Sequence, residues 1–229
     1  EPARLSCTND APLTLNLYHN VDFVFDNPFT FPERIGDANH FEGEGELVPV
    51  TRGAGVAKLN IWETNFVPDL TGFKLYELNE RGKGSLNVSF VLADGTMHAH
   101  VSEMPVGTYK KGHRHEADFH VYAVTGQGYS LLWYEGDEDF RRVDWRHGVV
   151  FAPPDMMFHQ HFNTSPEPAR YLAAAFGSIR YPITAAQRFV FTNAERSTKD
   201  GGIQIEYEEQ DARIHALYVE EMARTGAPI

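Results

Sequence analysis

Residues 107–115 of the chain read GTYKKGHRH, and the spacing of the two histidines decides how the rest of the sequence is interpreted. Alternate side chains of a β-strand point to the same face, so we expect His113 and His115 on one face and Arg114 on the other. Two imidazoles on one face can bind the same metal ion, each at about 2.0–2.1 Å. Two protein ligands are too few for a tight site, so a third ligand is expected from another part of the chain.

The third ligand is expected from residues 148–163, which read GVVFAPPDMMFHQHFN. His159 and His161 again have the spacing of residues on one strand face, and they follow a turn with two prolines. In a β-barrel, a strand about 40 residues further along the chain can lie beside the first. One of these two histidines would complete a three-histidine metal site with His113 and His115. His161 is a further ligand, a proton carrier or a group that orients a ligand, and we favour the last two roles.

Short β-rich runs alternate with turn residues from about residue 84 onward. We expect strands at residues 86–92, 97–104, 119–125, 129–134, 140–145, 148–152, 158–162 and 170–176. Runs at this spacing are typical of an antiparallel sandwich or barrel. The intervals are too short for crossover helices, which disfavours a parallel α/β sheet.

Two extensions flank this barrel, which we place at residues 84–182. Residues 1–83, with Asn27-Pro28 and Phe31-Pro32, are interpreted as an N-terminal arm of short strands and turns. Residues 183–229 are interpreted as a C-terminal extension with one helix. Its amphipathic stripe, within residues 209–224, consists of Ile214, Leu217, Tyr218 and Met222. We expect this stripe to pack on the barrel or on a partner subunit.

The two histidine stretches resemble the paired motifs of the cupin superfamily. The first family motif is Gly, five residues, His-x-His, three or four residues, Glu, six residues and Gly. The second is Gly, five residues, Pro, four residues, His, three residues and Asn. This sequence matches at Gly107, His113, His115, Gly126, Gly148, Pro154, His159 and Asn163, with Met156 where the second motif often has Gly. The resemblance covers residues 107–163 and implies an all-β cupin fold, a double-stranded β-helix or jelly-roll barrel. It also implies that His113, His115 and His159 are the metal ligands.

Phe119 stands where the first motif has its Glu ligand. The neighbouring His120 would replace that ligand only if the strand slipped or bulged, so we expect it to face outward or to be packed. A cupin with three histidines and no Glu, and with His-x-His before the Asn of its second motif, resembles the gentisate 1,2-dioxygenase-like branch. This resemblance implies an Fe(II) enzyme that opens aromatic rings. Three neutral imidazoles also leave the ion its full charge, which favours a chelating anionic substrate such as a hydroxy-carboxylate.

The composition limits the possible partners. The chain has 229 residues, a net charge of −12, one cysteine and 11 histidines, eight of which lie between residues 98 and 161. An acidic surface disfavours nucleic acid and anionic lipid as partners. No apolar run approaches the ~18 residues of a membrane span. A single cysteine fits a reducing compartment, so we expect a cytoplasmic protein.

The other polar and aromatic candidates have simpler interpretations. His98 and His100 share a strand face and either line the cavity or lie on a surface strand. His147 is interpreted as a turn residue, and Lys110-Lys111 as a solvated turn. Asn163 is expected to fix a turn or a hydrogen bond near the metal. We expect core or cavity-wall positions for the aromatic residues Tyr109, Phe119, Tyr122 and Phe158.

These observations favour a metal enzyme. The first hypothesis is an Fe(II)-dependent dioxygenase for a small anionic, aromatic substrate, in which His161 assists proton transfer and O2 is the second reactant. The second is an O2-independent isomerase, decarboxylase or hydrolase that uses Zn or Mn as a Lewis acid. The third is a non-catalytic ligand-binding cupin. Fe(II) is the expected ion, although Mn, Ni and Zn also accept imidazole. Exposed sheet edges favour a homo-oligomer.

Overall fold

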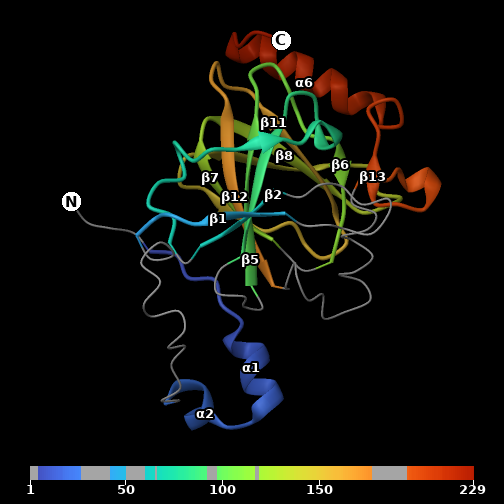
Figure 1. Cartoon of the computed structure of the whole chain (residues 1–229). Helices are drawn as coiled ribbons and strands as arrows, with labels where there is room; N and C mark the ends of the chain where they lie inside the picture. The colour runs from blue at the N-terminus through green and yellow to red at the C-terminus, as the bar shows by residue number, and fades with distance from the viewer. Residues whose placement is uncertain are drawn as a thin grey trace.

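The computed structural model describes residues 5–26, 42–49, 60–64, 66–91, 97–116, 119–176 and 195–229. Two β-sheets form the body of this part of the chain, and a C-terminal helix packs on the smaller sheet (Figure 1). The turns expected at Asn27-Pro28 and Phe31-Pro32, and the boundary between residues 182 and 183, lie outside the described residues. Across the described ranges, no helix is long and apolar enough to span a membrane.

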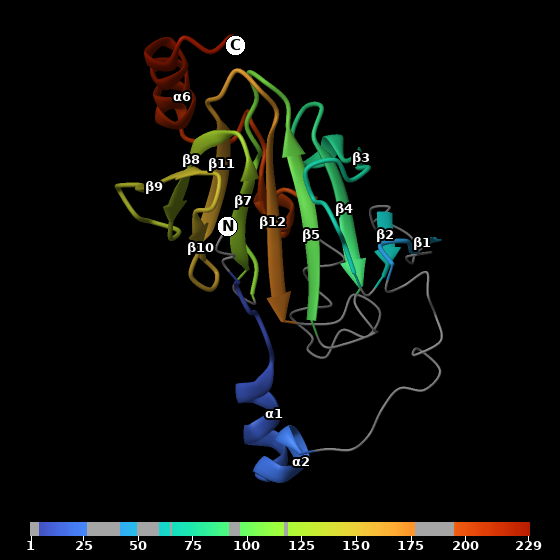
Figure 2. The same ribbon diagram turned by 90° about the vertical axis from the view of Figure 1, so that its left-hand side faces the viewer.

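The larger sheet has eight strands. In spatial order they are β1 (Glu46–Pro49), β2 (Asn60–Glu63), β4 (Leu86–Val91), β5 (Met97–Met104), β12 (Ala169–Phe176), β7 (His120–Thr125) and β10 (Val150–Phe151), with β3 (Tyr76–Glu77) paired to β4. The β2–β4 pair is parallel, and the other pairs are antiparallel. Figure 2 shows β4, β5 and β12 side by side.

The smaller sheet has five antiparallel strands. In order they are β13 (Gln204–Ile205), β6 (Gly112–His113), β11 (Phe158–Asn163), β8 (Gln127–Trp133) and β9 (Arg141–Arg146). The helical elements are α1 (Ala11–Tyr18), α2 (Val21–Phe25), η1 (Asn79–Arg81), η2 (Thr198–Asp200) and α6 (Ala212–Thr225). The sequence analysis did not predict α1 and α2, which lie within the expected arm.

Between β5 and β12 the chain passes back and forth between the two sheets. As a result, β12 lies between β5 and β7, and β11 lies between β6 and β8, although these strands are far apart in the sequence. This is the strand arrangement of a jelly-roll barrel. The all-β cupin fold expected from the sequence is therefore confirmed.

Strand alternation divides the side chains between the barrel interior and its outer faces. On β12, Tyr171 and Ala173 belong to an inner cluster with Val121 of β7, whereas Leu172 packs with an outer cluster. On β11, Phe162 belongs to the outer cluster beneath α6. The odd-numbered residues of β11, which include both histidines, therefore face the interior.

Helix α6 covers the outer face of the smaller sheet. Its buried apolar residues are Ile214, Tyr218 and Met222. They pack on the sheet residues Tyr129, Leu131, Trp133, Phe158 and Phe162. The predicted stripe was wrong at Leu217, which is 38% exposed. The helix begins after Asp211, whose side chain accepts a hydrogen bond from the Arg213 N–H, and ends at Gly226, which has a positive φ.

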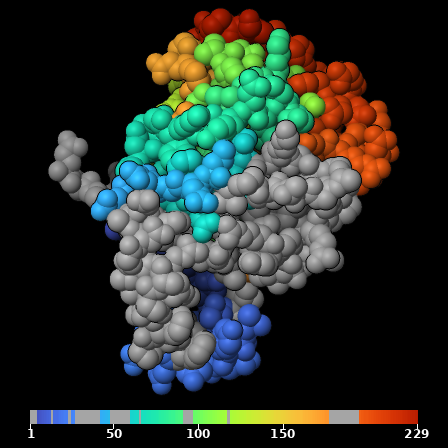
Figure 3. All heavy atoms as spheres, viewed as in Figure 1, coloured from blue at the N-terminus to red at the C-terminus, as the bar shows by residue number. Residues whose placement is uncertain are grey.

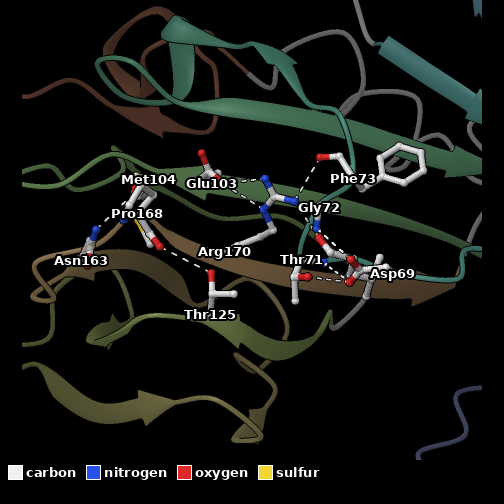
Figure 4. Close-up of polar contacts among 11 residues, drawn as sticks. Asp69, Thr71, Gly72, Phe73, Glu103, Met104, Thr125, Asn163, Pro168 and Arg170 are labelled. Carbon is white, nitrogen blue, oxygen red and sulfur yellow. Dashed lines mark hydrogen bonds and ion pairs between the residues drawn. The ribbon is translucent and has the colours of Figure 1, made fainter.

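The outer face of the larger sheet is covered by residues of the N-terminal arm, part of which forms the surface seen in Figure 3. Arg170, on the outer face of β12, connects this cover to the sheet. Its guanidinium donates to the carbonyls of Leu70 at 2.7 Å and Phe73 at 3.1 Å, and it forms an ion pair with Glu103 at 2.7 Å (Figure 4). Arg170 is buried, and these three acceptors satisfy the hydrogen-bonding groups of its planar guanidinium.

Glu221→Gln tests the electrostatic attachment of α6. Hydrogen bonds from Arg224 and Arg142 lower the pKa of Glu221 to about 2. A carboxyl group with a lowered folded-state pKa stabilises the fold above its ordinary pKa, and this stability is lost as the pH falls toward 2. We expect Glu221→Gln to lower the free energy of unfolding by roughly 1–2 kcal/mol at pH 7. This is less than the pKa shift of Glu221 alone implies, because solvent screens the interaction with the exposed Arg224.

The loss should shrink below about pH 4 and vanish near pH 2, as measured by urea unfolding across this range. The exposed neighbour Glu220→Gln is the control and should change stability little. A loss that stayed constant with pH would show that Glu221 acts through packing.

Candidate metal centre

The structure brings His113, His115 and His159 together inside the barrel. His113 of β6 and His159 of β11 are directly opposite each other in the antiparallel pair. One ring nitrogen of each of the three histidines lies within 4.8 Å of the other two. The Nε2 atoms of His113 and His159 are 3.1 Å apart, and nitrogens that share one ion at about 2.0–2.1 Å can be separated by at most about 4.2 Å. These two atoms therefore have a separation suitable for a shared ion.

The backbone orients all three rings. The Nδ1 atom of each ring faces a main-chain carbonyl oxygen. His113 Nδ1 lies 3.2 Å from the Lys111 oxygen, His115 Nδ1 lies 3.3 Å from the Glu116 oxygen, and His159 Nδ1 lies 3.1 Å from the Met157 oxygen. Because a carbonyl oxygen only accepts hydrogen bonds, each neutral ring carries its hydrogen on Nδ1 and keeps a lone pair on Nε2. The Nε2 lone pairs of His113 and His159 then face each other with no proton between them. A cation relieves this repulsion, so the donor set fits a divalent metal ion.

The three histidines are also held in the protonation state that binds metal. Burial, followed by the charge of Arg81 and by the neighbouring histidines, lowers the pKa of His113 well below its ordinary value. Burial has the same effect on His115 and lowers the pKa of His159 to about 4. Neutral imidazole is the form that coordinates a metal, so at neutral pH these side chains need not lose a proton to bind.

Phe119 forms an apolar wall beside the three histidines. Its ring centroid lies 4.6 Å from that of His115, 5.3 Å from that of His100 and 5.5 Å from that of His98. His98 and His100 were expected either to line the cavity or to lie on a surface strand, and the structure shows that they line the interior. Burial lowers the pKa of His100 to about 3. An aromatic ring fills the place where the family motif has its carboxylate.

His161 lies next to His159 on the same face of β11 and is 3% exposed. Its Nδ1 is 2.7 Å from the Ser130 hydroxyl, which also accepts a hydrogen bond from Trp145 Nε1 at 3.0 Å. The indole only donates, so the Ser130 hydrogen is free to point at His161 Nδ1. In the tautomer that carries its hydrogen on Nε2, His161 accepts this hydrogen bond at Nδ1. Burial, followed by the charge of His159, lowers the pKa of His161 well below its ordinary value.

Asn163 stabilises a turn and does not contact the histidines. Its amide group donates to the carbonyls of Met104, Pro105 and Glu167, and its oxygen accepts from Ser165. Of the two roles expected for this residue, the structure supports the turn.

Three polar candidates point away from the centre, as expected. The guanidinium of Arg114 lies 4.5 Å from the ring centroid of Phe158 and pairs with Glu135 at 2.9 Å. His120 is exposed. His147 lies at a turn, with Nδ1 2.7 Å from the Val124 carbonyl.

The aromatic candidates are divided between three environments. Phe158 is buried beneath α6, and Tyr109 packs against the same cluster. Phe119 is a wall of the interior. The prediction was wrong for Tyr122, which is half-buried on the outer face of β7 with its ring centroid 6.1 Å from that of His147. Strand alternation explains this difference, because Val121 and Ala123 on either side of it face the interior.

Lys110 is the largest error of the sequence analysis at this site. It was expected in a solvated turn, but it is 2% exposed. Its neighbour Lys111 is the more exposed of the two and forms an ion pair with Glu206 at 2.6 Å. The two adjacent lysines therefore have different environments, and the sequence analysis treated them alike.

The inward position of Lys110 follows from the outward position of its neighbour Tyr109, and a β-bulge then brings His113 to the same side. Tyr109 pairs with Phe162, and His113 pairs with His159. Residues 110–112 therefore stand opposite residues 160–161, so one strand has an extra residue between the two pairs. The bulge allows Lys110 and His113, three positions apart, to face the same side. Gly112 was the signal in the sequence, because glycine within a strand often marks a bulge.

Comparisons with known proteins concern the fold. No family model and no curated protein matches the chain. A cupin 2 conserved barrel domain protein from Rhodopseudomonas palustris is 19% identical, with a TM-score of 0.39 over 48% of this chain and 76% of that chain. A predicted oxalate decarboxylase from Thermotoga maritima is 18% identical, with a TM-score of 0.40 over 49% and 99%. An oxalate decarboxylase from Lactobacillus farciminis is 20% identical, with a TM-score of 0.40 over 57% and 37%. These solved structures are of cupin-domain proteins, and such similarity does not identify a reaction.

His113→Ala tests the centre directly. The variant removes one of the two facing Nε2 atoms, so we expect the loss of stoichiometric metal after loading with Zn or Fe(II) and gel filtration. His120→Ala removes an exposed histidine of the same chain and should bind metal like the wild type. Metal content is measured by elemental analysis, with circular dichroism to establish that both variants fold. A folded His113→Ala variant with a full metal complement would refute the ligand assignment.

Proposed function

We propose that this protein is a non-haem Fe(II)-dependent dioxygenase that acts on a small anionic, aromatic substrate of the hydroxybenzoate type. The observation that supports this proposal best is the donor set: three neutral imidazoles converge through Nε2, and Phe119 stands in the place of a carboxylate ligand. Iron(II) held by His113, His115 and His159 would keep its full charge and place substrate and O2 next to each other for electron transfer. The resemblance of the motifs to the gentisate 1,2-dioxygenase-like branch also supports the proposal.

The residues around the centre suit an aromatic ligand. Phe119 presents its ring beside His115, and His98 and His100 lie edge-on to it. Rings pack well in such edge-to-face arrangements. An aromatic substrate would replace water against this wall, and its polar groups would then be directed toward the histidines.

His161 is proposed as the group that holds a proton near the reacting substrate. Ser130 fixes its ring and directs the Nε2 hydrogen away from that hydroxyl. Its lowered pKa means that it is neutral at rest, so its Nε2–H can donate a hydrogen bond to a developing negative charge.

Two other functions remain candidates. Imidazole ligands also accept Zn and Mn, so an O2-independent isomerase, decarboxylase or hydrolase is the second, and a non-catalytic ligand-binding cupin is the third.

We also propose a homo-oligomer in the cytoplasm. The exposed apolar side chains of Leu217 and Val219 on α6 and of Val150 on the edge strand β10 support association between copies.

Oxygen uptake tests the proposed reaction. Protein loaded anaerobically with Fe(II) is offered hydroxybenzoates, aminophenols and small keto acids, and O2 is followed with an electrode. We expect uptake with at least one hydroxybenzoate and its loss in His159→Ala, with His120→Ala as the active control. Absence of uptake with iron-loaded protein, together with turnover of the same compounds by the Zn or Mn form without O2, would favour the second function.

His161→Gln tests the proton-holding role. Glutamine keeps a hydrogen-bonding side chain but cannot carry the proton, so we expect kcat to fall by about 10²–10⁴. Ser130→Ala should reduce kcat less, by about 10–100, because the ring loses only its orienting partner. Both variants should keep stoichiometric metal. If His161→Gln lost its metal, His161 would be a ligand instead.

A further inference from the structure

Lys110 is a buried cation inside the barrel that the reaction outlined above does not use. It is 2% exposed, and its N–H donates to the His161 carbonyl at 2.9 Å. Burial is the main cause of the lowered pKa values of His161 and His100, and the charge of Lys110 lowers both values further. The backbone hydrogen bond makes Lys110 and His161 neighbours on adjacent segments of the sheet, so their buried side chains lie side by side.

The charge of Lys110 is not balanced by the described part of the protein. Among the residues that the structure describes, no carboxylate forms an ion pair with it. The nearby cation Arg81, by contrast, is influenced by the opposite charge of Glu195. Lys111 has Glu206 as its partner. A buried charge without a counter-charge is strongly unfavourable. Burial, with a further contribution from Arg81, accordingly lowers the pKa of Lys110 to about 7.

The β-bulge makes this position specific. Tyr109 packs on the outer face beneath α6, so alternation turns Lys110 inward, but without the extra residue before His113 that histidine would then face outward. With it, the ammonium group and the metal ligand His113 share one side of the strand. Bulges next to active sites commonly redirect a side chain in this way.

We propose that Lys110 binds the carboxylate of an anionic substrate inside the barrel, with the Nε2–H of His161 as a second donor. This inference depends on the proposed function, because the carboxylate belongs to the molecule that the metal centre acts on. The substrate would supply the counter-charge that Lys110 lacks among the described residues. A carboxylate held there would fix the orientation of the aromatic ring beside Phe119. Lys110 is thus a positioning residue for the substrate and not a metal ligand.

The test measures recognition of the carboxylate without requiring turnover. Isothermal titration calorimetry is carried out at neutral pH on Zn-loaded protein with salicylate and with salicyl alcohol, which keeps the ring and the phenol but has no carboxylate. We expect the wild type to bind salicylate roughly 10–100-fold more tightly than the alcohol, as for a charge-assisted hydrogen bond. Lys110→Met should lose most of this preference, and Lys110→Arg should retain part of it. Lys111→Met, which removes the adjacent solvent-side lysine, should bind like the wild type.

Thermal unfolding separates a binding role from a structural one. Methionine removes a buried charge at similar volume, so Lys110→Met without ligand should melt at the same temperature as the wild type or higher. Salicylate should raise the Tm of the wild type and of Lys111→Met but not that of Lys110→Met. A lower Tm for Lys110→Met, with salicylate binding otherwise intact, would show that the lysine is structural and would overturn the proposal.

The outcomes distinguish this inference from the proposed reaction. A wild-type protein with no preference for salicylate, or a Lys110→Met variant that keeps the preference, would overturn the role of Lys110. If the preference depends on Lys110 but Fe(II)-loaded protein consumes no O2 with any hydroxybenzoate, the anion site is retained and the dioxygenase assignment fails.

Discussion

The pairing of His113 with His159 across β6 and β11 is the constraint on which the candidate site depends. Residues directly opposite each other in an antiparallel pair have their side chains on the same face, with Cβ atoms about 4.5–5.5 Å apart. Two histidines that are distant in the chain therefore meet without the help of a loop. Strand β11 is also held on its other edge by β8 along its whole length. The two candidate ligands are thus held by the backbone hydrogen bonds of the sheet, which position side chains more precisely than a loop does.

The parts of the site that follow from local geometry could be predicted from the sequence. Strand alternation placed His113 and His115 on one face and Arg114 on the other, and the motif spacing selected His159 as the third member. For Asn163 the sequence left two roles open, and its hydrogen bonds in the structure support the turn. The all-β fold followed from the regular spacing of strands and turns. These features depend on neighbouring residues, so sequence distance is a sufficient guide to them.

The features that were missed depend on register between distant strands. Whether Lys110 and His113 face the same side is decided by the extra residue opposite β11, and a single strand read alone shows only weak signs of such a bulge. The choice for His98 and His100 required the position of β5 beside β12 and the contact with Phe119. Tyr122 was misplaced because aromatic character was given more weight than alternation. In α6, Leu217 lies at helical spacing but beyond the edge of the contact with the sheet.

The charges inside the barrel and on its surface oppose each other, and this opposition bears on substrate choice. The chain has a net charge of −12, so its long-range field repels an anion. Among the described residues the candidate ligands are three neutral imidazoles, and a divalent ion held by them would keep its full charge inside the barrel that also contains Lys110. Interactions between charges are strongest where water is excluded, so this local positive charge can outweigh the repulsion from the distant surface. An anionic ligand would then balance the metal ion and the lysine together, whereas a neutral ligand would leave both charges buried and uncompensated.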